Sequence, residues 1–336
     1  MPNGAVGQIC GVPDLFQDPQ PTTRKVTPIC AHLEMIADGT PFRFGARVFE
    51  FGDGVAELKD SSPLLGDTEA LRRRLAADGY LFVRGFHDVE AVREARAWTL
   101  GAIAERGGIE PGSAAEEGIA SAAQRNFPFF RVTSVAHAPP VLNVVDSEAT
   151  FSFFRRLFGK PAITFDKRWL RCMARGGQNH FHYDNVYVGR GTPNRLTLWS
   201  PLTDIALDEG PLVICLGSHR HVRLRQTYGM TDMDRDLTEA VFSSDPKELV
   251  DDFGFTLGTA HFRPGDALLF GMFMMHSSAP NLSGRYRISI DTRYQPADEA
   301  KDERFFFGDN GRWLGNFHNE GARYTPMAEL RQRWGL

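Results

Sequence analysis

Hydrophobic and polar positions divide the chain into two regions of different periodicity. Apolar residues recur at helical spacing in three early segments, where we expect helices: residues 67–79, 88–106 and 148–158. Asp67 or Thr68 is placed to cap the first of these, and Gly79 to end it. From Ile163 the pattern changes to short strand-like runs separated by turns, which is typical of a sandwich or barrel.

Strand patterns also occur outside that second region. Residues 42–58 alternate like a strand pair and predict a small hairpin, and YLFVRGF after Gly79 predicts a buried strand. Residues 109–145 and 222–259 interrupt the pattern and are candidate lids over a site, with surface decoration as the alternative. We expect an N-terminal arm and hairpin over 1–65, the main domain over 66–310 and a C-terminal extension over 311–336.

Composition favours a globular enzyme without a nucleic-acid or membrane partner. The 336 residues carry a net charge of −4, which gives no electrostatic attraction to nucleic acid or anionic lipid. No apolar run reaches the roughly 18 residues that cross a bilayer, and the N-terminus lacks a signal-peptide pattern. The four cysteines share no metal-site spacing, so we expect reduced thiols and a cytoplasmic location.

Two histidines and one carboxylate form the most informative motif of the chain. His182 and Asp184 lie two residues apart in a segment expected to be extended, continuing into the strand-like run VYV, so both side chains project from one side. His276 follows the apolar run ALLFGMFMM. Two imidazoles and one carboxylate are the facial triad that leaves three positions open on non-haem Fe(II). These residue types predict an iron site, whereas we expect His219 and His261 to have structural roles.

Arg287 adds a second chemical function. A turn, NLSG, reverses the chain after His276, and Arg287 comes eleven residues after that histidine in an alternating strand. A guanidinium binds carboxylate bidentately and stays charged, so Arg287 is a candidate partner for a dicarboxylate co-substrate. The combination predicts an oxygenase that uses Fe(II), 2-oxoglutarate and O₂.

The region from about Ile163 to Pro296 resembles the phytanoyl-CoA dioxygenase family of 2-oxoglutarate oxygenases. The resemblance is carried by His182-x-Asp184, LTLWSPLTDIALDEGPLVICLGSHR, PGDALLF, His276 with APNLS, and Arg287. The segment DGYLFVRGF resembles the entry strand of that family, and residues 1–65 fall outside the match. The resemblance implies an α+β protein with a double-stranded β-helix (jelly-roll) core flanked by helices.

The resemblance also implies roles for individual residues. His182, Asp184 and His276 would ligate iron, and Arg287 would hold the distal carboxylate of 2-oxoglutarate. Further candidates are Trp199 and Ser289 for the co-substrate, His180, Gln178 and Asn185 for the substrate, and Phe165, Trp199, Phe270 and Met272 as a water-excluding lining or as plain core.

The expected reaction is hydroxylation of a C–H bond in a small or medium organic molecule, with decarboxylation of 2-oxoglutarate to succinate and CO₂. The same centre performing desaturation, epoxidation or cyclisation is the first alternative. A cupin-type dioxygenase without a 2-oxo acid is disfavoured by Arg287, and an inactive jelly-roll binding module by the intact set of three ligands. The sequence names neither the substrate nor the oligomeric state.

Overall fold

The computed structural model describes residues 35–306 and 322–336 of the chain. One compact unit runs from Ile36 to Leu336, and the description below concerns that unit. Most of the predicted N-terminal arm and the first part of the predicted C-terminal extension lie outside the described residues.

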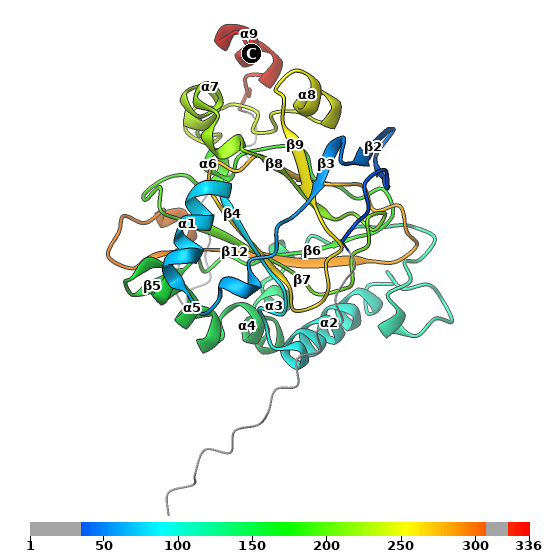
Figure 1. The fold of residues 1–336 in the computed structure, drawn as a ribbon. Helices are drawn as coiled ribbons and strands as arrows, with labels where there is room; N and C mark the ends of the chain where they lie inside the picture. Colours follow the sequence, from blue (N-terminus) through cyan, green and yellow to red (C-terminus); the bar gives the residue numbers. More distant parts are fainter. Residues whose placement is uncertain (1–34, 307–321) are drawn as a thin grey trace, which may run out of the picture. The chain divides into compact units, whose positions relative to one another are not determined.

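Two β-sheets form the centre of the unit (Figure 1). The first sheet has the strand order β1 (Pro41–Phe44), β2 (Arg47–Phe51), β3 (Gly54–Glu57), β9 (Thr256–Thr259), β8 (Leu212–Leu216) and β11 (His276–Ser278). The second has the order β4 (Tyr80–Val83), β10 (Ala267–Gly271), β7 (Leu196–Pro201), β12 (Arg287–Pro296) and β5 (Ala162–Thr164), and β6 (Trp169–Met173) also pairs with β12.

The predicted N-terminal hairpin is present as β1 and β2, which pair antiparallel. It continues into β3, which pairs in parallel with both β2 and β9. The hairpin therefore belongs to the first sheet and to the compact unit that starts at Ile36. The domain limits expected at residues 65 and 310 stay predictions.

The second sheet is buried on both faces. Along β10, Leu268 and Phe270 point into the cluster between the sheets, whereas Ala267 and Leu269 point into a cluster shared with two helices. Those helices are α1 (Thr68–Asp78) and α5 (Glu148–Phe158). Strand residues alternate between faces, so a strand covered on both sides is apolar throughout, as β10 is.

The early helices cover the second sheet, as Figure 1 shows for α1, α2 (Val89–Ala104), α4 (Pro139–Val145) and α5. The carboxylate of Asp67 accepts from the N–H of Ala70 at 2.9 Å, so Asp67 is the cap of α1, and Gly79 ends that helix in the left-handed conformation. The three predicted helices are α1, α2 and α5, and their bounds agree with the prediction to within two residues. Within the candidate lid 109–145, α3 (Thr133–Ala136) and α4 bury apolar residues against α2.

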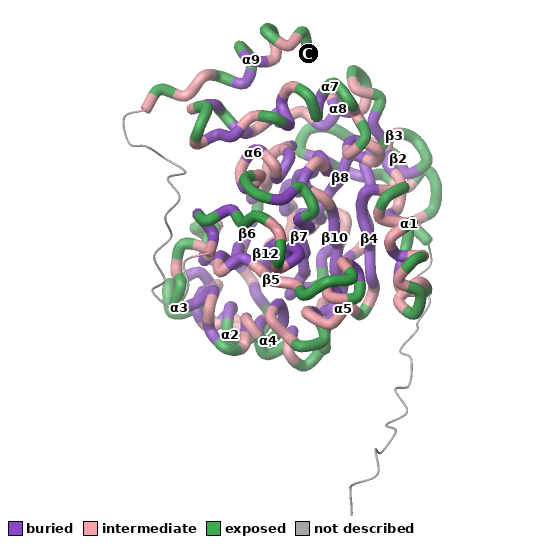
Figure 2. The backbone as a smooth tube through the Cα atoms, turned by 90° about the vertical axis from the view of Figure 1, so that its left-hand side faces the viewer, coloured by how far each residue is buried: buried purple, intermediate pink, exposed green. Residues whose placement is uncertain are grey.

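The segment after β8 packs on the first sheet. It contains α7 (Val222–Gln226) and α8 (Pro246–Asp251), and the C-terminal helix α9 (Met327–Trp334) bonds to both: Arg223 donates to the carbonyl of Trp334 and Arg331 to Glu248. Short 3₁₀ helices lie at Ser62–Leu64, Ala115–Glu117, Phe129–Arg131, Ser218–Arg220, Tyr228–Met230 and Glu303–Phe305. Figure 2 shows long buried stretches along β4, β7, β10 and β12 of the second sheet.

Two expectations from the sequence concern the cysteines, expected to be reduced thiols, and the absence of a membrane span. Cys172 and Cys215 are buried free thiols, while Cys10 and Cys30 lie outside the described residues. Within the described ranges, no helix has the length and apolar character needed to cross a bilayer.

Gly79 and Gly85 flank β4 and provide a matched pair for testing this packing. Both have positive φ, but a Cβ at Gly79 would lie 2.4 Å from Nδ1 of His219 and 2.6 Å from Cε of Met274, whereas one at Gly85 would meet nothing within 4 Å. The left-handed conformation costs a non-glycine residue about 1–2 kcal/mol, and overpacking adds about 1–3 kcal/mol. We expect Gly79→Ala to lower the free energy of unfolding by about 1–3 kcal/mol more than Gly85→Ala in urea denaturation. Equal losses would contradict the crowding seen at Gly79.

Candidate metal centre

The two candidate histidines are direct neighbours across an antiparallel pair. The N–H of each donates to the carbonyl of the other, and both distances are 3.1 Å. This pairing, beside β11, brings together residues that are far apart in the sequence. The centroids of the two imidazole rings lie 4.3 Å apart.

Backbone carbonyls orient both rings. Nδ1 of His182 lies 2.6 Å from the carbonyl oxygen of His180, and Nδ1 of His276 lies 2.9 Å from that of Met274. A carbonyl only accepts hydrogen bonds, so Nδ1 is the protonated nitrogen in each ring and Nε2 keeps a free lone pair. A histidine whose other nitrogen is held in this way is arranged as metal ligands usually are.

Asp184 completes the group from the first turn of helix α6 (Asp184–Val188). The predicted strand-like continuation at VYV was therefore wrong, because these residues are helical. Oδ1 of Asp184 nevertheless lies 3.8 Å from Nε2 of His182 and 3.9 Å from Nε2 of His276. One ligand atom from each residue falls within 4.8 Å of the others, so these three are a group that can hold a metal ion.

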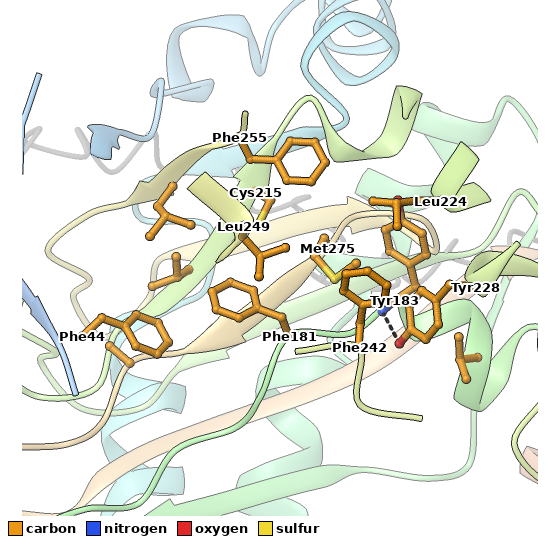
Figure 3. Packing of buried hydrophobic residues seen from close by; sticks show 14 of the residues in the cluster. Phe44, Phe181, Tyr183, Cys215, Leu224, Tyr228, Phe242, Leu249, Phe255 and Met275 are labelled. Atoms are coloured by element: carbon orange, nitrogen blue, oxygen red, sulfur yellow. Dashed lines mark hydrogen bonds between the residues drawn. The ribbon is translucent and has the colours of Figure 1, made fainter. Parts of the chain in front are cut away.

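Apolar neighbours hold the motif on the core (Figure 3). Phe181 and Tyr183, on either side of His182, point into the large cluster beneath the first sheet, as does Met275 beside His276. The hydroxyl of Tyr183 donates to the carbonyl of Ser218 at 2.9 Å. Side chains alternate along an extended segment. Each histidine therefore points away from this apolar cluster, to the side where the cavity of the candidate site lies.

Electrostatics keep the three side chains in the protonation states that metal binding needs. Burial lowers the pKa of His182 to about 3, with the nearby His276 as a further cause, and burial also lowers the pKa of His276. Burial alone would raise the pKa of Asp184, but Arg293 and the two histidines outweigh it and hold that pKa well below its usual range. Two neutral imidazoles and an ionised carboxylate result at neutral pH.

A chain of charged side chains runs from Asp184 along the inner face of the second sheet. Nη2 of Arg293 lies 2.7 Å from both carboxylate oxygens of Asp184, and Thr197 donates to Oδ2. Nη1 of Arg293 donates to Asp291, whose Oδ1 lies 3.2 Å from Nε of Arg171. Two carboxylates and two guanidiniums alternate, so each buried charge meets an opposite one.

Arg287 lies on the same strand and is buried, with 2% of its surface exposed. Nε donates to the carbonyl of Gly210 at 3.1 Å and Nη1 to the hydroxyl of Ser289 at 2.6 Å, but Nη2 has no hydrogen-bond partner among the described residues. Burial lowers the pKa of Arg287 to about 9, with the nearby Arg171 as the next cause, so the guanidinium is still charged at neutral pH. A buried cation with an unused donor is suited to a carboxylate ligand.

The candidate co-substrate residues surround one inner cavity. It is lined by both histidines, Arg287, Trp199 and Phe270 among others, and Cζ of Arg287 lies 5.2 Å from the centroid of the Trp199 ring. The hydroxyl of Ser289 accepts a hydrogen bond from Arg287. A direct contact between Ser289 and a co-substrate stays a prediction. Phe165 and Met272, the other two expected lining residues, belong to a separate buried cluster.

An outer cavity of about 800 Å³ is lined by two members of the metal group, His182 and Asp184. His180 and Gln178 line it, as predicted for substrate contacts. Asn185 is absent from its lining and donates through its amide to the carbonyl of Gly229 at 2.7 Å. The two candidate lids both contribute to the wall, through Phe130, Arg131 and Thr133 from one and Met233 and Val241 from the other.

Sequence reasoning missed Arg171, Asp291 and Arg293. A signal was available, because apolar and polar residues alternate in RISID and in LRC. Ile288 and Ile290 of β12 and Leu170 of β6 face the helices, so Asp291, Arg293 and Arg171 must face the interior.

Comparison with known proteins identifies the family. The family model described as "Phytanoyl-CoA dioxygenase (PhyH)" matches residues 75–289. The chain belongs to this family. The predicted resemblance is therefore confirmed, and the chain is an enzyme, an oxidoreductase of the Fe(II)- and 2-oxoglutarate-dependent class.

Individual relatives agree in chemistry and fold. The chain is 29% identical over 261 residues to a 1-deoxypentalenic acid 11-beta-hydroxylase of Streptomyces arenae, covering 74% of this chain and 88% of that protein. The enzyme of that name from Streptomyces exfoliatus is 28% identical over 266 residues, with the same coverage. The structure of EctD from S. alaskensis matches with TM-score 0.52 and 17% identity over 81% of this chain and 91% of that one.

A further structural match confirms the fold class. The non-heme alpha ketoglutarate dependent epimerase SnoN from nogalamycin biosynthesis matches with TM-score 0.51 and 17% identity, covering 78% of this chain and 98% of that chain. The predicted α+β fold with a jelly-roll core is confirmed by these matches. The residues of this chain fit the cofactors of the class, because they offer two imidazole nitrogens, one carboxylate and a buried arginine with an unused donor.

We expect His182→Ala, Asp184→Ala and His276→Ala each to weaken Fe(II) binding strongly, since each removes one of the three candidate ligands. The measurement is an anaerobic titration with Fe(II), monitored by calorimetry. His261→Ala serves as the control and should bind as the parent does. An unchanged affinity in His276→Ala would show that the third ligand is misassigned.

Arg293→Gln tests whether Arg293 is the charge partner of Asp184. Without that cation Asp184 stays buried and uncompensated, which costs about 3–5 kcal/mol. Fe(II) supplies the missing positive charge, so its addition should raise the melting temperature of Arg293→Gln by more than that of the parent. Arg195→Gln is the matched control, because Arg195 is also buried but bonds to Gln295 and backbone carbonyls. Equal metal-induced shifts in all three proteins would contradict the assignment.

Proposed function

We propose that this enzyme hydroxylates a C–H bond of a small or medium organic molecule at an iron centre held by His182, Asp184 and His276. The observation that supports the proposal most is that both histidines of this group and Arg287, with its unused donor, line one inner cavity. A metal triad explains the histidines, and a dicarboxylate co-substrate explains the buried arginine. No single alternative accounts for both.

The chain's own residues bind, orient and exclude water. Bound Fe(II) with 2-oxoglutarate supplies oxidative chemistry, coupled to release of succinate and CO₂. Arg287 binds the distal carboxylate of 2-oxoglutarate through Nη2, and Ser289 with Gly210 keeps the guanidinium in place. Trp199 covers the arginine, and Phe270 contributes to an apolar wall that excludes water from the reacting atoms.

The substrate binds in the outer cavity, in contact with His180 and Gln178. A cavity of this size accepts a drug-sized molecule. Both Streptomyces relatives are hydroxylases of 1-deoxypentalenic acid by name, which supports hydroxylation of a small molecule here. The enzyme needs no nucleic acid and no membrane for this reaction, and we infer a cytoplasmic location.

Desaturation, epoxidation and cyclisation need the same iron centre and remain the alternative outcomes. A cupin-type dioxygenase without a 2-oxo acid would have no use for the unpaired donor of Arg287. A binding module without catalysis would have no use for three convergent ligands whose ring nitrogens are oriented by carbonyls.

Anaerobic titration separates these three classes. In the proposed function, Fe(II) and 2-oxoglutarate together produce a weak visible charge-transfer band that neither gives alone. A cupin-type enzyme would bind Fe(II) without the band, and a binding module would take up neither. After O₂ is admitted, substrate screening by succinate release identifies the substrate, and mass spectrometry of the product distinguishes an added oxygen from the loss of two hydrogens.

Arg287→Ala should raise the concentration of 2-oxoglutarate needed for the visible band by about ten- to a hundredfold. A charge-assisted bond of this kind contributes about 1.5–3 kcal/mol. Fe(II) affinity should change little, because Arg287 is not a ligand. Arg285→Ala is the control: Arg285 is exposed and two residues away, on the turn side. Equal effects at Arg285 and Arg287 would show that the strand is misassigned.

A further inference from the structure

Three cationic side chains gather on one wall of the outer cavity. Cζ of Arg131 and Cζ of Arg171 lie 5.7 Å and 5.1 Å from the centroid of the Phe130 ring, and Nζ of Lys167 lies 5.7 Å from the same centroid. All four residues line the cavity. An aromatic ring stabilises a nearby cation by about 0.5–1 kcal/mol at exposed sites, whereas like charges on one wall repel one another.

The two arginines of this wall have guanidinium N–H donors that are not used within the described residues. Nε of Arg171 is bound to Asp291, but its two terminal nitrogens make no hydrogen bond to any described residue. Arg131 is exposed and forms no ion pair within residues 35–306 and 322–336. Two guanidinium groups therefore present open donors to a ligand in the cavity.

The cofactors do not neutralise this wall. Fe(II) and 2-oxoglutarate carry opposite charges of equal size, so their joint binding leaves the surrounding charge unchanged. Burial, with the charges of Arg131 and Arg171 as further causes, lowers the pKa of Lys167 to about 8. An anion at this wall would relieve the repulsion that these shifts reflect.

Another part of the outer cavity is apolar, beside polar groups that include His180 and Gln178. Side chains that contribute apolar surface are Phe130, Trp169, Tyr187, Val188, Met233 and Val241. A ligand that fits both parts has one anionic group and a hydrophobic body, in the size range of a cavity of about 800 Å³. A coenzyme A thioester matches this cavity less well than a free acid does. Coenzyme A is larger and carries several phosphates, and forming the thioester removes the carboxylate of the acid.

We propose that the substrate is a largely apolar free carboxylic acid whose carboxylate is bound by Arg131 and Arg171, with Lys167 beside them. The inference rests on the proposed function and specifies its substrate class. Arg171 is linked through Asp291 and Arg293 to Asp184. The substrate carboxylate is thereby held on the same network as the metal ligand, which gives the hydrophobic body one orientation toward the iron.

The test is equilibrium binding to the full chain, loaded anaerobically with Fe(II) and saturating 2-oxoglutarate so that no turnover occurs. The probes are adamantane-1-carboxylate, cyclohexylacetate and decanoate, each beside its primary amide and its CoA thioester, measured by calorimetry. At least one acid should bind about tenfold more tightly than its amide, because the amide lacks the charge. The same acid should also bind more tightly than its thioester.

Arginine variants locate the carboxylate. Arg131→Gln and Arg171→Gln should each weaken binding of the preferred acid by about tenfold and leave binding of its amide within about twofold. Arg175→Gln is the matched control, because Arg175 is exposed and absent from the cavity lining. Arg171→Gln could also weaken binding indirectly, because Arg171 bonds to Asp291. Arg131 does not bond to Asp291, so Arg131→Gln tests the carboxylate contact without that indirect effect.

The inference is overturned if no acid binds more tightly than its amide, if thioesters bind more tightly than the acids, or if the preference survives in both arginine variants. The visible band of the Fe(II)–2-oxoglutarate complex is read on the same samples. Failure of the proposed function would remove that band, whereas failure of this inference leaves it intact.

Discussion

The neutralisation of buried charge is the constraint on which the site depends. Asp184, Arg287, Asp291 and Arg293 lie in the interior with 2–5% of their surface exposed. Removing the partner of a buried charge costs about 3–5 kcal/mol, so a stable interior requires an opposite charge for each. Arg293 meets both carboxylates, and Arg171 shares Asp291. Arg287 forms no ion pair among the described residues and its Nη2 has no hydrogen-bond partner, and we propose that a co-substrate carboxylate completes the balance.

The two-residue period of the strands delivers these charges to one side. On β12 the isoleucines at 288 and 290 face the helices, and the charged residues Arg287, Asp291 and Arg293 face the other sheet. The metal motif obeys the same rule, since Phe181 and Tyr183 enter the core and His182 enters the cavity. Burial of the apolar residues thus supplies the free energy that positions the polar ones. A shift of one residue in either segment would turn the apolar side chains into the cavity and the polar side chains into the core.

Much of this arrangement was predictable from sequence because it depends on local patterns. The caps of α1, the buried strand after Gly79 and the convergence of His182, Asp184 and His276 follow from periodicity, turns and motif spacing. The strand pattern predicted a sandwich or barrel, and the resemblance to the family narrowed this to a jelly roll. The helical state of residues 184–188 did not, since a short run such as VYV has strand propensity and is overridden by tertiary packing. The outer cavity was also out of reach, because its wall combines two separate insertions with β6, and no local pattern reports which of their side chains meet.

The central claim is that one interior site holds iron through three side chains and 2-oxoglutarate through a fourth. The most direct measurement is a crystal structure of the enzyme grown anaerobically with Fe(II) and 2-oxoglutarate. The account predicts one metal ion bonded to Nε2 of His182, Nε2 of His276 and a carboxylate oxygen of Asp184, with the distal carboxylate of 2-oxoglutarate on Nη2 of Arg287. Metal bound elsewhere, or 2-oxoglutarate bound away from Arg287, would contradict it.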